Sequence, residues 1–384
     1  MKKLLIVLFT ALLAAGFVAC SNPSSENTIP TFPASPSTPP APTYSVTIEP
    51  STNGTVTASK TSGIAAGETI TLTVTPAVTD DMDYKLGRLS VKNGDVDVTI
   101  TNNSFTMPSG NVKVTATFDV IVYYGTKKPS KAKEVGDIVF NDGSAMPYAD
   151  FEALSDEAKN AKKTAAIALI FYKGTGLNSD AADGTADTTT SRTLGVGLKH
   201  YKIGLAWCLS SADACNKDIT TIRCLSYANV IPNSWYFTGD KNGSDNLEQI
   251  EAFEGVDDTG TSANYPAFYF AKNYSITATN LGTDYASGWY LPSIAELFQI
   301  YACRADSTNG FDIDAASAAL GGSQFGESLY WSSTQNKIMS NIAYMCQFIY
   351  NINTNVSGWG SGIILNRKSY GDYGNCVCAI RAFN

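Results

Sequence analysis

The chain has 384 residues, of which 44% are hydrophobic and 16% charged, and its formal net charge at pH 7 is −8. This length predicts two or three domains. The acidic balance and the absence of a Lys/Arg-rich run argue against nucleic acid as a partner. The single histidine, His200, excludes multi-histidine metal sites and leaves one place for a histidine-dependent nucleophile.

Residues 1–19 have the organisation of an export signal. Two lysines precede the apolar stretch from Leu4 to Ala15, which is too short to span a bilayer comfortably. Small residues then precede Cys20, a pattern that resembles a bacterial lipobox. The resemblance implies cleavage, acylation of Cys20 and attachment to a lipid bilayer, and the serine that follows favours the outer membrane. The alternative is an ordinary signal peptide with an incidental cysteine.

Residues 20–43 form the predicted lipid anchor and a Pro/Ser-rich linker. Seven prolines lie between Pro23 and Pro42. This composition cannot bury a core and favours extended polyproline II, which at about 3.1 Å per residue would span about 70 Å. We expect a spacer that displays the following domains above the membrane. A proline-rich ligand for another domain is the alternative.

Residues 44–119 have the pattern of a small β domain. Apolar and polar residues alternate in Tyr44–Ile48, Thr69–Thr75 and Asn111–Phe118, and turn residues separate these runs. The stretch Gly54–Pro76 together with Phe105–Pro108 resembles the divergent internalin-type bacterial repeat. The resemblance implies a β-grasp-like spacer or adhesion module of cell-surface proteins, without catalysis.

Residues 120–384 predict an α+β domain with few helices and many short strands. Ser155 is expected to cap a short helix, and Ser293 and Glu296 have capping-box spacing at the start of another. Apolar runs predict further elements, which are a helix over Tyr265–Tyr274 and strands within Ala165–Tyr172, Tyr330–Ser333, Ala343–Tyr350 and Cys376–Phe383.

Three motifs of this domain, Gly288–Leu297, Tyr330–Ser333 and Cys378–Arg381, resemble the Lcl C-terminal domain family. That family has a C-type-lectin-like fold related to formylglycine-generating enzymes. Gly204–Cys208 and Phe237–Asn246 are similar to the treponemal variable lipoproteins (Treponema variable protein A-like). In that group the C-terminal segment, here about residues 331–384, is the variable region of a diversity-generating retroelement and forms the ligand-binding face.

The composition of residues 335–375 independently favours binding. Tyr, Ser, Gly and Asn are abundant, and paratopes use them because aromatic rings give contact area at low entropy cost. Substituting the adenines of an asparagine codon yields Tyr, Asp, Ser, Thr, Ile or Gly, most of which are frequent here. The residues predicted to contact the ligand are Asn336, Ile338, Asn341, Tyr344, Tyr350, Ile352, Asn353, Trp359, Ile364, Tyr370 and Asp372. Those expected inside are Trp331, Ala343, Phe348, Ala379 and Ile380.

The sequence therefore predicts a non-enzymatic surface adhesin with an unidentified protein or glycan ligand, no cofactor and no metal. A static, non-diversified adhesin is the alternative, and an oxidoreductase of the formylglycine-generating kind is a further, less favoured one. The loop Asp240–Asp245 carries oxygen ligands suited to calcium, but it lacks a bidentate glutamate at the right distance and favours a turn.

Seven cysteines remain after Cys20, and an exported chain permits disulfides whose pairing the sequence leaves open. Cys376 and Cys378 should share one face of a strand, with Val377 on the other. Their spacing of about 6.6 Å along a strand makes a mutual disulfide awkward. His200, beside Tyr201, is expected to be an ordinary surface or strand residue.

Overall fold

The computed structural model describes residues 40–180, 185, 187–231, 234–256, 264–305, 311–348, 362–371 and 375–384. The predicted signal peptide, Cys20 and the linker as far as residue 39 lie outside these ranges. The chain divides into two compact units, a smaller one drawn from residues 1–116 and a larger one that contains residues 117–384. Among the described helices, none combines the length and apolarity needed to cross a membrane.

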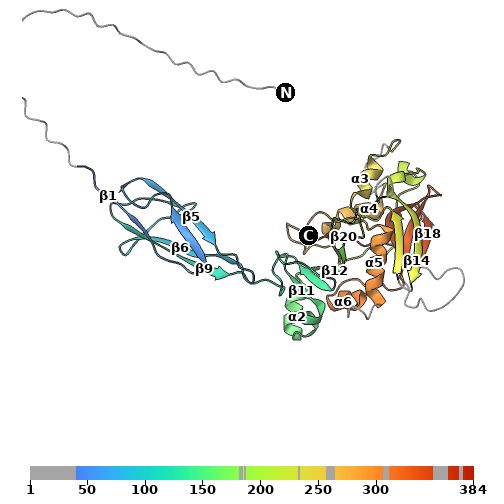
Figure 1. Ribbon diagram of the computed structural model, residues 1–384, viewed down its shortest axis with the longest axis horizontal. Helices are drawn as coiled ribbons and strands as arrows, with labels where there is room; N and C mark the ends of the chain where they lie inside the picture. Colours follow the sequence, from blue (N-terminus) through green and yellow to red (C-terminus); the bar gives the residue numbers. More distant parts are fainter. Residues whose placement is uncertain are drawn as a thin grey trace, which may run out of the picture. The chain divides into compact units, whose positions relative to one another are not determined.

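Residues 43–120 form β strands (Figure 1). The strands are β1 (Thr43–Tyr44), β2 (Val46–Ile48), β3 (Gly54–Ala58), β4 (Ile64–Ala65), β5 (Thr69–Pro76), β6 (Tyr84–Asn93), β7 (Val96–Val98), β8 (Ser104–Thr106) and β9 (Val112–Val120). They pair in the orders β2-β9-β6-β7, β3-β5-β8 and β1-β4. In β5, Ile70 and Leu72 are buried while Thr71 between them is exposed, as the alternating pattern predicts.

The larger unit contains two sheets. The first has the order β11-β10-β12-β13-β20, with β10 (Asp137–Phe140), β11 (Ala145–Pro147), β12 (Ala166–Gly174), β13 (Arg192–Gly197) and β20 (Ile380–Ala382). The second has the order β15-β14-β16-β17-β18, with β14 (Arg223–Ile231), β15 (Ser234–Gly239), β16 (Leu329–Asn336), β17 (Ile342–Gln347), β18 (Ile363–Arg367), and β19 (Asn375–Cys376) beside β16. Strands and helices share one unit, so the predicted α+β class is confirmed.

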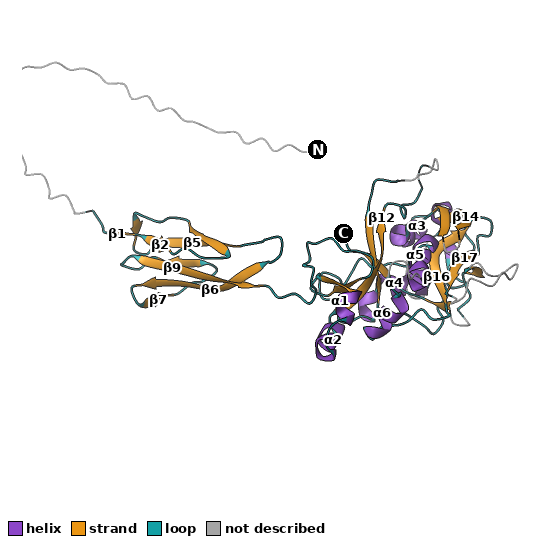
Figure 2. Cartoon of the chain, turned by 60° about the horizontal axis from the view of Figure 1, so that its bottom comes forward, coloured by secondary structure: helices purple, strands orange, loops and turns teal. Residues whose placement is uncertain are grey.

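Helix α5 (Ile294–Ala305) lies between the two sheets, as both views of the chain show (Figures 1 and 2). Its residues Leu297 and Phe298 belong to a core that also takes side chains from both sheets. The predicted capping box is present, because Ser293 N–H donates to Glu296 Oε2 (2.8 Å) and Glu296 N–H donates to Ser293 Oγ (3.2 Å). The sequence thus predicted the start of the central helix correctly.

Short helices cover the rest of the unit. They are α1 (Tyr148–Glu152), α2 (Asp156–Lys163), α3 (Asn246–Glu251), α4 (Pro266–Lys272), α6 (Ile313–Ala319) and the 3₁₀ turns η1 (Asp213–Cys215), η2 (Thr220–Ile222), η3 (Gly243–Asp245) and η4 (Tyr274–Ile276). Ser155 caps α2 as predicted. Helix α4 begins with Pro266, and proline suits this position because a backbone N–H there would have no partner within the helix.

The C-terminal strand differs from its prediction. Residues 376–383 are not one strand, because β19 pairs with β16 in the second sheet and β20 pairs with β13 in the first. The chain crosses between the sheets over Val377–Ala379, where every residue is fully buried. Cys376 and Cys378 nevertheless face one core and Val377 the other, so the predicted alternation is confirmed.

Candidate ligand-binding face

The variable-type segment is held by a fixed scaffold on both sides. Five residues predicted to lie inside are completely buried, which confirms that prediction: Trp331, Ala343, Phe348, Ala379 and Ile380. Trp331 also donates its indole N–H to the Leu205 carbonyl (2.6 Å). Both strands β16 and β17 are therefore anchored in the two cores, and among the described residues nearby the turn that connects them and the neighbouring strand β18 present apolar side chains to solvent.

The turn between β16 and β17 presents apolar side chains. Ile338 is 80% exposed and Met339 45% exposed. Asn336, predicted to contact a ligand, is instead buried beneath them, and its Oδ1 accepts from Ile338 N–H (2.8 Å) and Met339 N–H (3.0 Å). Asn341, half-buried, accepts on its carbonyl from Lys368 N–H (2.9 Å). The turn therefore has a fixed backbone and an exposed isoleucine at its tip.

Strand β18 adds a third exposed apolar residue, Leu365, which is 41% exposed and pairs with Tyr344 of β17. Tyr344 was predicted to contact a ligand, but only 3% of it is exposed. Ile364 pairs with Met345 and packs, half-buried, against the second core. Tyr370, in the turn after β18, is 45% exposed and fits the prediction.

A tyrosine from outside the variable-type segment completes this surface. The Tyr227 ring on β14 meets the Tyr344 ring edge-on at 6.0 Å and is 43% exposed. Directly paired residues of antiparallel strands project to the same face, so Leu365 lies on the Tyr344 side of the sheet. We call Tyr227, Ile338, Met339 and Leu365 the apolar face, whereas the Tyr370 carbonyl accepts from Asn375 Nδ2 (2.9 Å) elsewhere in the unit.

The structure brings together some predicted residues and not others. Ile338 is on the apolar face and Tyr370 is exposed outside it, while Asn336 and Tyr344 support the face from within. The remaining predicted contacts fall outside the described residues, and these are Tyr350, Ile352, Asn353, Trp359 and Asp372. Sequence reasoning missed Tyr227 and its exposed neighbour Leu225, although the apolar run before a Pro-Asn dipeptide was a usable strand signal.

Lys368 fixes the end of β18. It is completely buried, and its Nζ donates to the Ala214 carbonyl (2.9 Å) and to Gln335 Oε1 (2.8 Å). The ammonium also lies 4.6 Å from the centre of the Trp207 ring. Burial lowers the pKa of Lys368 to about 8. This lysine is a positioning residue that sequence analysis did not single out.

A buried polar network underlies β16 and the start of α5. The Glu296 carboxylate accepts from Gly243 N–H (3.1 Å) and Tyr290 O–H (3.0 Å) and pairs with Arg192 Nη2 (2.9 Å). A Cβ on Gly243 would lie 2.5 Å from the Leu291 carbonyl oxygen, so only glycine allows this approach. The network ties α5 to β13 and to the loop before α3.

The Asp240–Asp245 loop is part of the same network. Asp240 is buried, and its carboxylate accepts from Asn246 Nδ2 (2.8 Å) and from the hydroxyls of Thr334 and Ser179 (both 3.1 Å). Burial raises the pKa of Asp240 to about 7. In the described ranges, no cluster of His, Cys, Asp or Glu is arranged to hold a metal ion.

His200 lies in the loop after β13 and not in a strand. Its Nδ1 is 2.8 Å from the Tyr330 hydroxyl, and its ring centre is 4.5 Å from that of Phe325. Burial lowers its pKa to about 3, so the imidazole is neutral. The expectation of a strand residue was therefore wrong, and the half-buried ring packs against the aromatic side chains of Phe325 and Tyr330.

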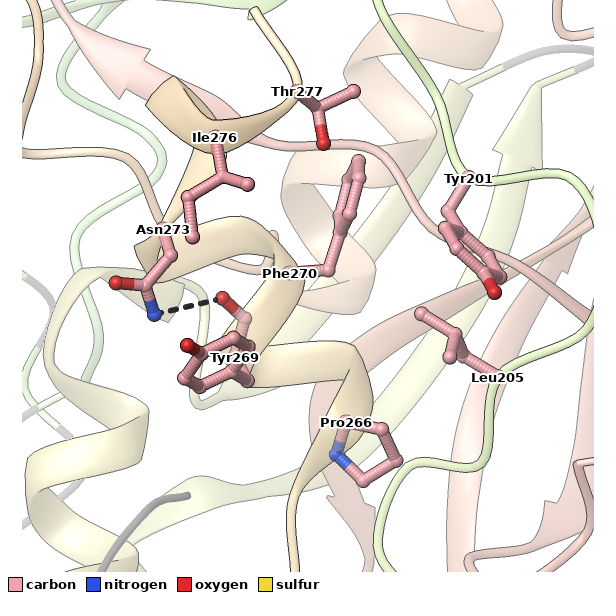
Figure 3. Close-up of a pocket in the computed structure, with 8 residues that line it drawn as sticks. All are labelled: Tyr201, Leu205, Pro266, Tyr269, Phe270, Asn273, Ile276 and Thr277. Carbon is pink, nitrogen blue, oxygen red and sulfur yellow. Dashed lines mark hydrogen bonds between the residues drawn. The ribbon is translucent and has the colours of Figure 1, made fainter. Parts of the chain in front are cut away.

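An apolar pocket of about 270 Å³ is lined by residues other than those of the apolar face (Figure 3). Tyr269 and Phe270 of α4 form one wall, and Tyr201 and Leu205 form the opposite one. Asn273 Nδ2 donates to the Tyr269 carbonyl (3.1 Å), so part of its polar capacity is used within its own helix. This lining suits apolar groups.

Comparison with known proteins gives two similarities, and no curated protein matches the chain. A fimbrial protein from Bacteroides ovatus is similar in structure at 12% sequence identity and a TM-score of 0.41, over 89% of this chain and 69% of that one. Residues 44–122 match the model of the divergent InlB B-repeat domain. Such repeats are carried by bacterial surface proteins, so the match is consistent with a surface protein. The N-terminal β domain is therefore similar to a divergent bacterial repeat, as its sequence predicted.

Proposed function

We propose that the chain is a lipid-anchored protein of the bacterial outer surface whose C-terminal domain, of the C-type-lectin-like kind, binds a protein or glycan without catalysis. The observation that carries the proposal is the apolar face. A soluble domain rarely gathers large exposed apolar side chains around one sheet edge unless they bind something. Here Ile338, Met339 and Leu365 do so within the segment that sequence analysis identified as variable in type.

The scaffold supports a diversified face. A retroelement can replace side chains freely only where the backbone is held by residues that do not change. Lys368 and Trp331 hold β18 and β16 by buried contacts, whereas the exposed Ile338 makes its only described hydrogen bond through its backbone. Exchanging Ile338, Leu365 or Tyr370 would therefore cost little stability while changing what the surface recognises.

The chemistry of the described cysteines favours binding over oxidoreductase activity. A reactive cysteine needs a lowered pKa and access to substrate. All seven cysteines after Cys20 are buried, and burial raises the pKa of Cys376 and Cys378. Their thiols therefore stay protonated within the cores, and the acidic net charge of −8 disfavours nucleic acid as the ligand.

The apolar face can be tested by introducing one charged side chain that would become buried when the ligand binds. The wild type is first screened against a printed glycan array and against immobilised fibronectin, laminin and collagen. Leu365→Asp should weaken binding to the component that the wild type binds by at least about fivefold, because a hot-spot side chain contributes about 1 kcal/mol or more to the binding free energy. Ile276→Asp is the control, since Ile276 is 68% exposed on another element. Unchanged binding by Leu365→Asp, with Ile276→Asp also unchanged, would contradict the assignment.

The anchor can be tested separately. If Cys20 is acylated, labelled palmitate should be incorporated into the protein in the source bacterium, and Cys20→Ala should release the protein from the membrane fraction. The physical reason is that stable attachment requires two or more acyl chains on the N-terminal residue. A wild-type protein that is exported without label would show that residues 1–19 are an ordinary signal peptide.

A further inference from the structure

Strand β18 is an edge strand of the second sheet. It stands last in the order β15-β14-β16-β17-β18, and in the described part of the chain it pairs on one side alone, with β17. The outer side of an edge strand carries backbone N–H and C=O groups that can pair with another chain. The hydrogen bonds between β18 and β17 identify the residues that carry these groups.

The register of the two strands is fixed at both ends. Gln347 N–H donates to the Gly362 carbonyl (2.7 Å), and Lys368 N–H donates to the Asn341 carbonyl (2.9 Å). Opposed residues of antiparallel strands alternate between pairs that exchange hydrogen bonds and pairs that do not. Every second residue from Gly362 to Lys368 therefore turns its backbone groups toward β17. The residues between them turn their backbone groups outward, and these are Ile363, Leu365 and Arg367.

The outer side of β18 is closed at one end and open along the rest. Arg367 N–H donates to Asn366 Oδ1 (2.9 Å), and the Arg367 carbonyl accepts from Tyr370 N–H (3.0 Å). Among the described residues, none forms a hydrogen bond with the outward N–H and C=O groups of Ile363 and Leu365. These two donors and two acceptors are spaced as an added strand requires.

Cationic side chains border the apolar face at this edge. Leu365 and Arg367 project to the same side of the sheet, because alternate residues of a strand do, and both are exposed. Lys337, in the turn between β16 and β17, is exposed as well, and Arg367 pairs with Ile342 just after that turn. In the described ranges, neither Lys337 nor Arg367 forms an ion pair. An acidic group on a partner would complement these charges.

We propose that the edge of β18 binds an extended segment of a partner protein as a further strand, with an apolar side chain on Leu365 and an acidic side chain beside Arg367. Backbone bonds give such complexes affinity, and alternate side chains give specificity. A glycan lacks the repeated amide groups that pair with an edge, and a second copy of the chain would bring like charges together. This binding mode rests on the function proposed above and narrows its ligand to an extended acidic peptide.

A random heptapeptide library displayed on phage and panned on the full chain supplies the probe. Selected peptides should place an acidic residue two positions from an apolar one, the spacing that puts both on one face of a strand. The selected peptide is then synthesised with each backbone amide methylated in turn. Methylation should weaken binding by about tenfold or more at alternate positions and scarcely between them, because only alternate amides face the edge. This measurement leaves the protein unaltered.

Two substitutions test the same contacts from the side of the protein. Leu365→Pro removes the outward N–H without breaking a bond to β17, and proline is tolerated on an edge strand in that position. It should bind the peptide about threefold or more weakly than Leu365→Ala, the matched control that keeps the N–H. Melting temperatures of both variants show that the unit is folded.

Arg367→Glu should weaken binding of the acidic peptide by about threefold or more and improve binding of the same peptide with lysine in place of its acidic residue. Arg88→Glu is the control, since Arg88 is exposed in the N-terminal β domain, and it should bind both peptides as the wild type does.

Methylation effects without a period of two would overturn the edge assignment, as would a peptide that binds Leu365→Pro and Arg367→Glu as tightly as the wild type. A library that yields no peptide, while a glycan or matrix protein binds and responds to Leu365→Asp, would also overturn it and leave the proposed function standing. Failure of the function itself is distinct, because then Leu365→Asp changes no binding at all.

Discussion

Glu296→Ala is expected to lower the free energy of unfolding of the larger unit by about 3–5 kcal/mol, the usual cost of leaving one partner of a buried ion pair alone. The side chain is fully buried, and its removal strands the Arg192 guanidinium and the Gly243 N–H. For a unit of this size the melting temperature should fall by about 10 °C.

Tryptophan fluorescence during denaturant unfolding measures this change cleanly, because all five tryptophans lie after residue 200, within the larger unit. Glu248→Ala is the control, since Glu248 is 60% exposed and its nearest cation, Lys272, is 4.0 Å away. The control should change stability by less than about 0.5 kcal/mol. A loss below about 1 kcal/mol for Glu296→Ala would show that the network is not what holds α5 in place.

Lys368 should make the stability of the larger unit rise with pH in the alkaline range. Its pKa is about 8 in the folded chain, against 10.5 for an ordinary lysine. Between these values the unfolded chain binds more protons than the folded chain, so the free energy of unfolding increases with pH by up to roughly 3 kcal/mol. Below pH 8 the lysine is charged in both states, and this contribution is absent.

The contribution of Lys368 is obtained as the difference in the free energy of unfolding between the wild type and Lys368→Met at each pH, because other groups titrate in the same range. Cys208 and Cys215 are thiols close enough to act electrostatically on the ammonium, and both proteins retain them. The wild type should gain stability relative to Lys368→Met between pH 8 and 10.5, whereas Lys272→Met, at an exposed site, should follow the wild type. A pH-independent difference would show that Lys368 titrates normally.

Local signals in the sequence predicted much of this fold. The alternation in β5, the Ser155 cap and the Ser293–Glu296 capping box each depend on residues within one element, so spacing alone is informative. The partners of Glu296 were not predictable in this way. Arg192 is far away in the sequence, and nothing in the local pattern of either residue indicates that the two meet.

The residues of the binding face were harder to predict from the sequence, for a related reason. Strand β17 is buried on both faces, with Tyr344 in the first core and Met345 in the second, so its sequence lacks the alternation that separates solvent from core. Composition directed attention to this segment but could not tell Ile338, which is exposed, from Tyr344, which is not. Only the pairing of β17 between β16 and β18 makes that distinction.

Sequencing the locus tests the proposed diversified binding face most directly. We expect a near-duplicate of the coding segment for residues 331–384 close to the gene, with a reverse transcriptase nearby. The two copies should differ almost only at adenines, in the codons of Ile338, Asn341 and Tyr370 and of Tyr350 and Asn353, while those of Trp331, Ala343 and Phe348 agree. Absence of a near-duplicate, or differences spread over all four bases and over buried codons, would contradict the account and leave a static adhesin.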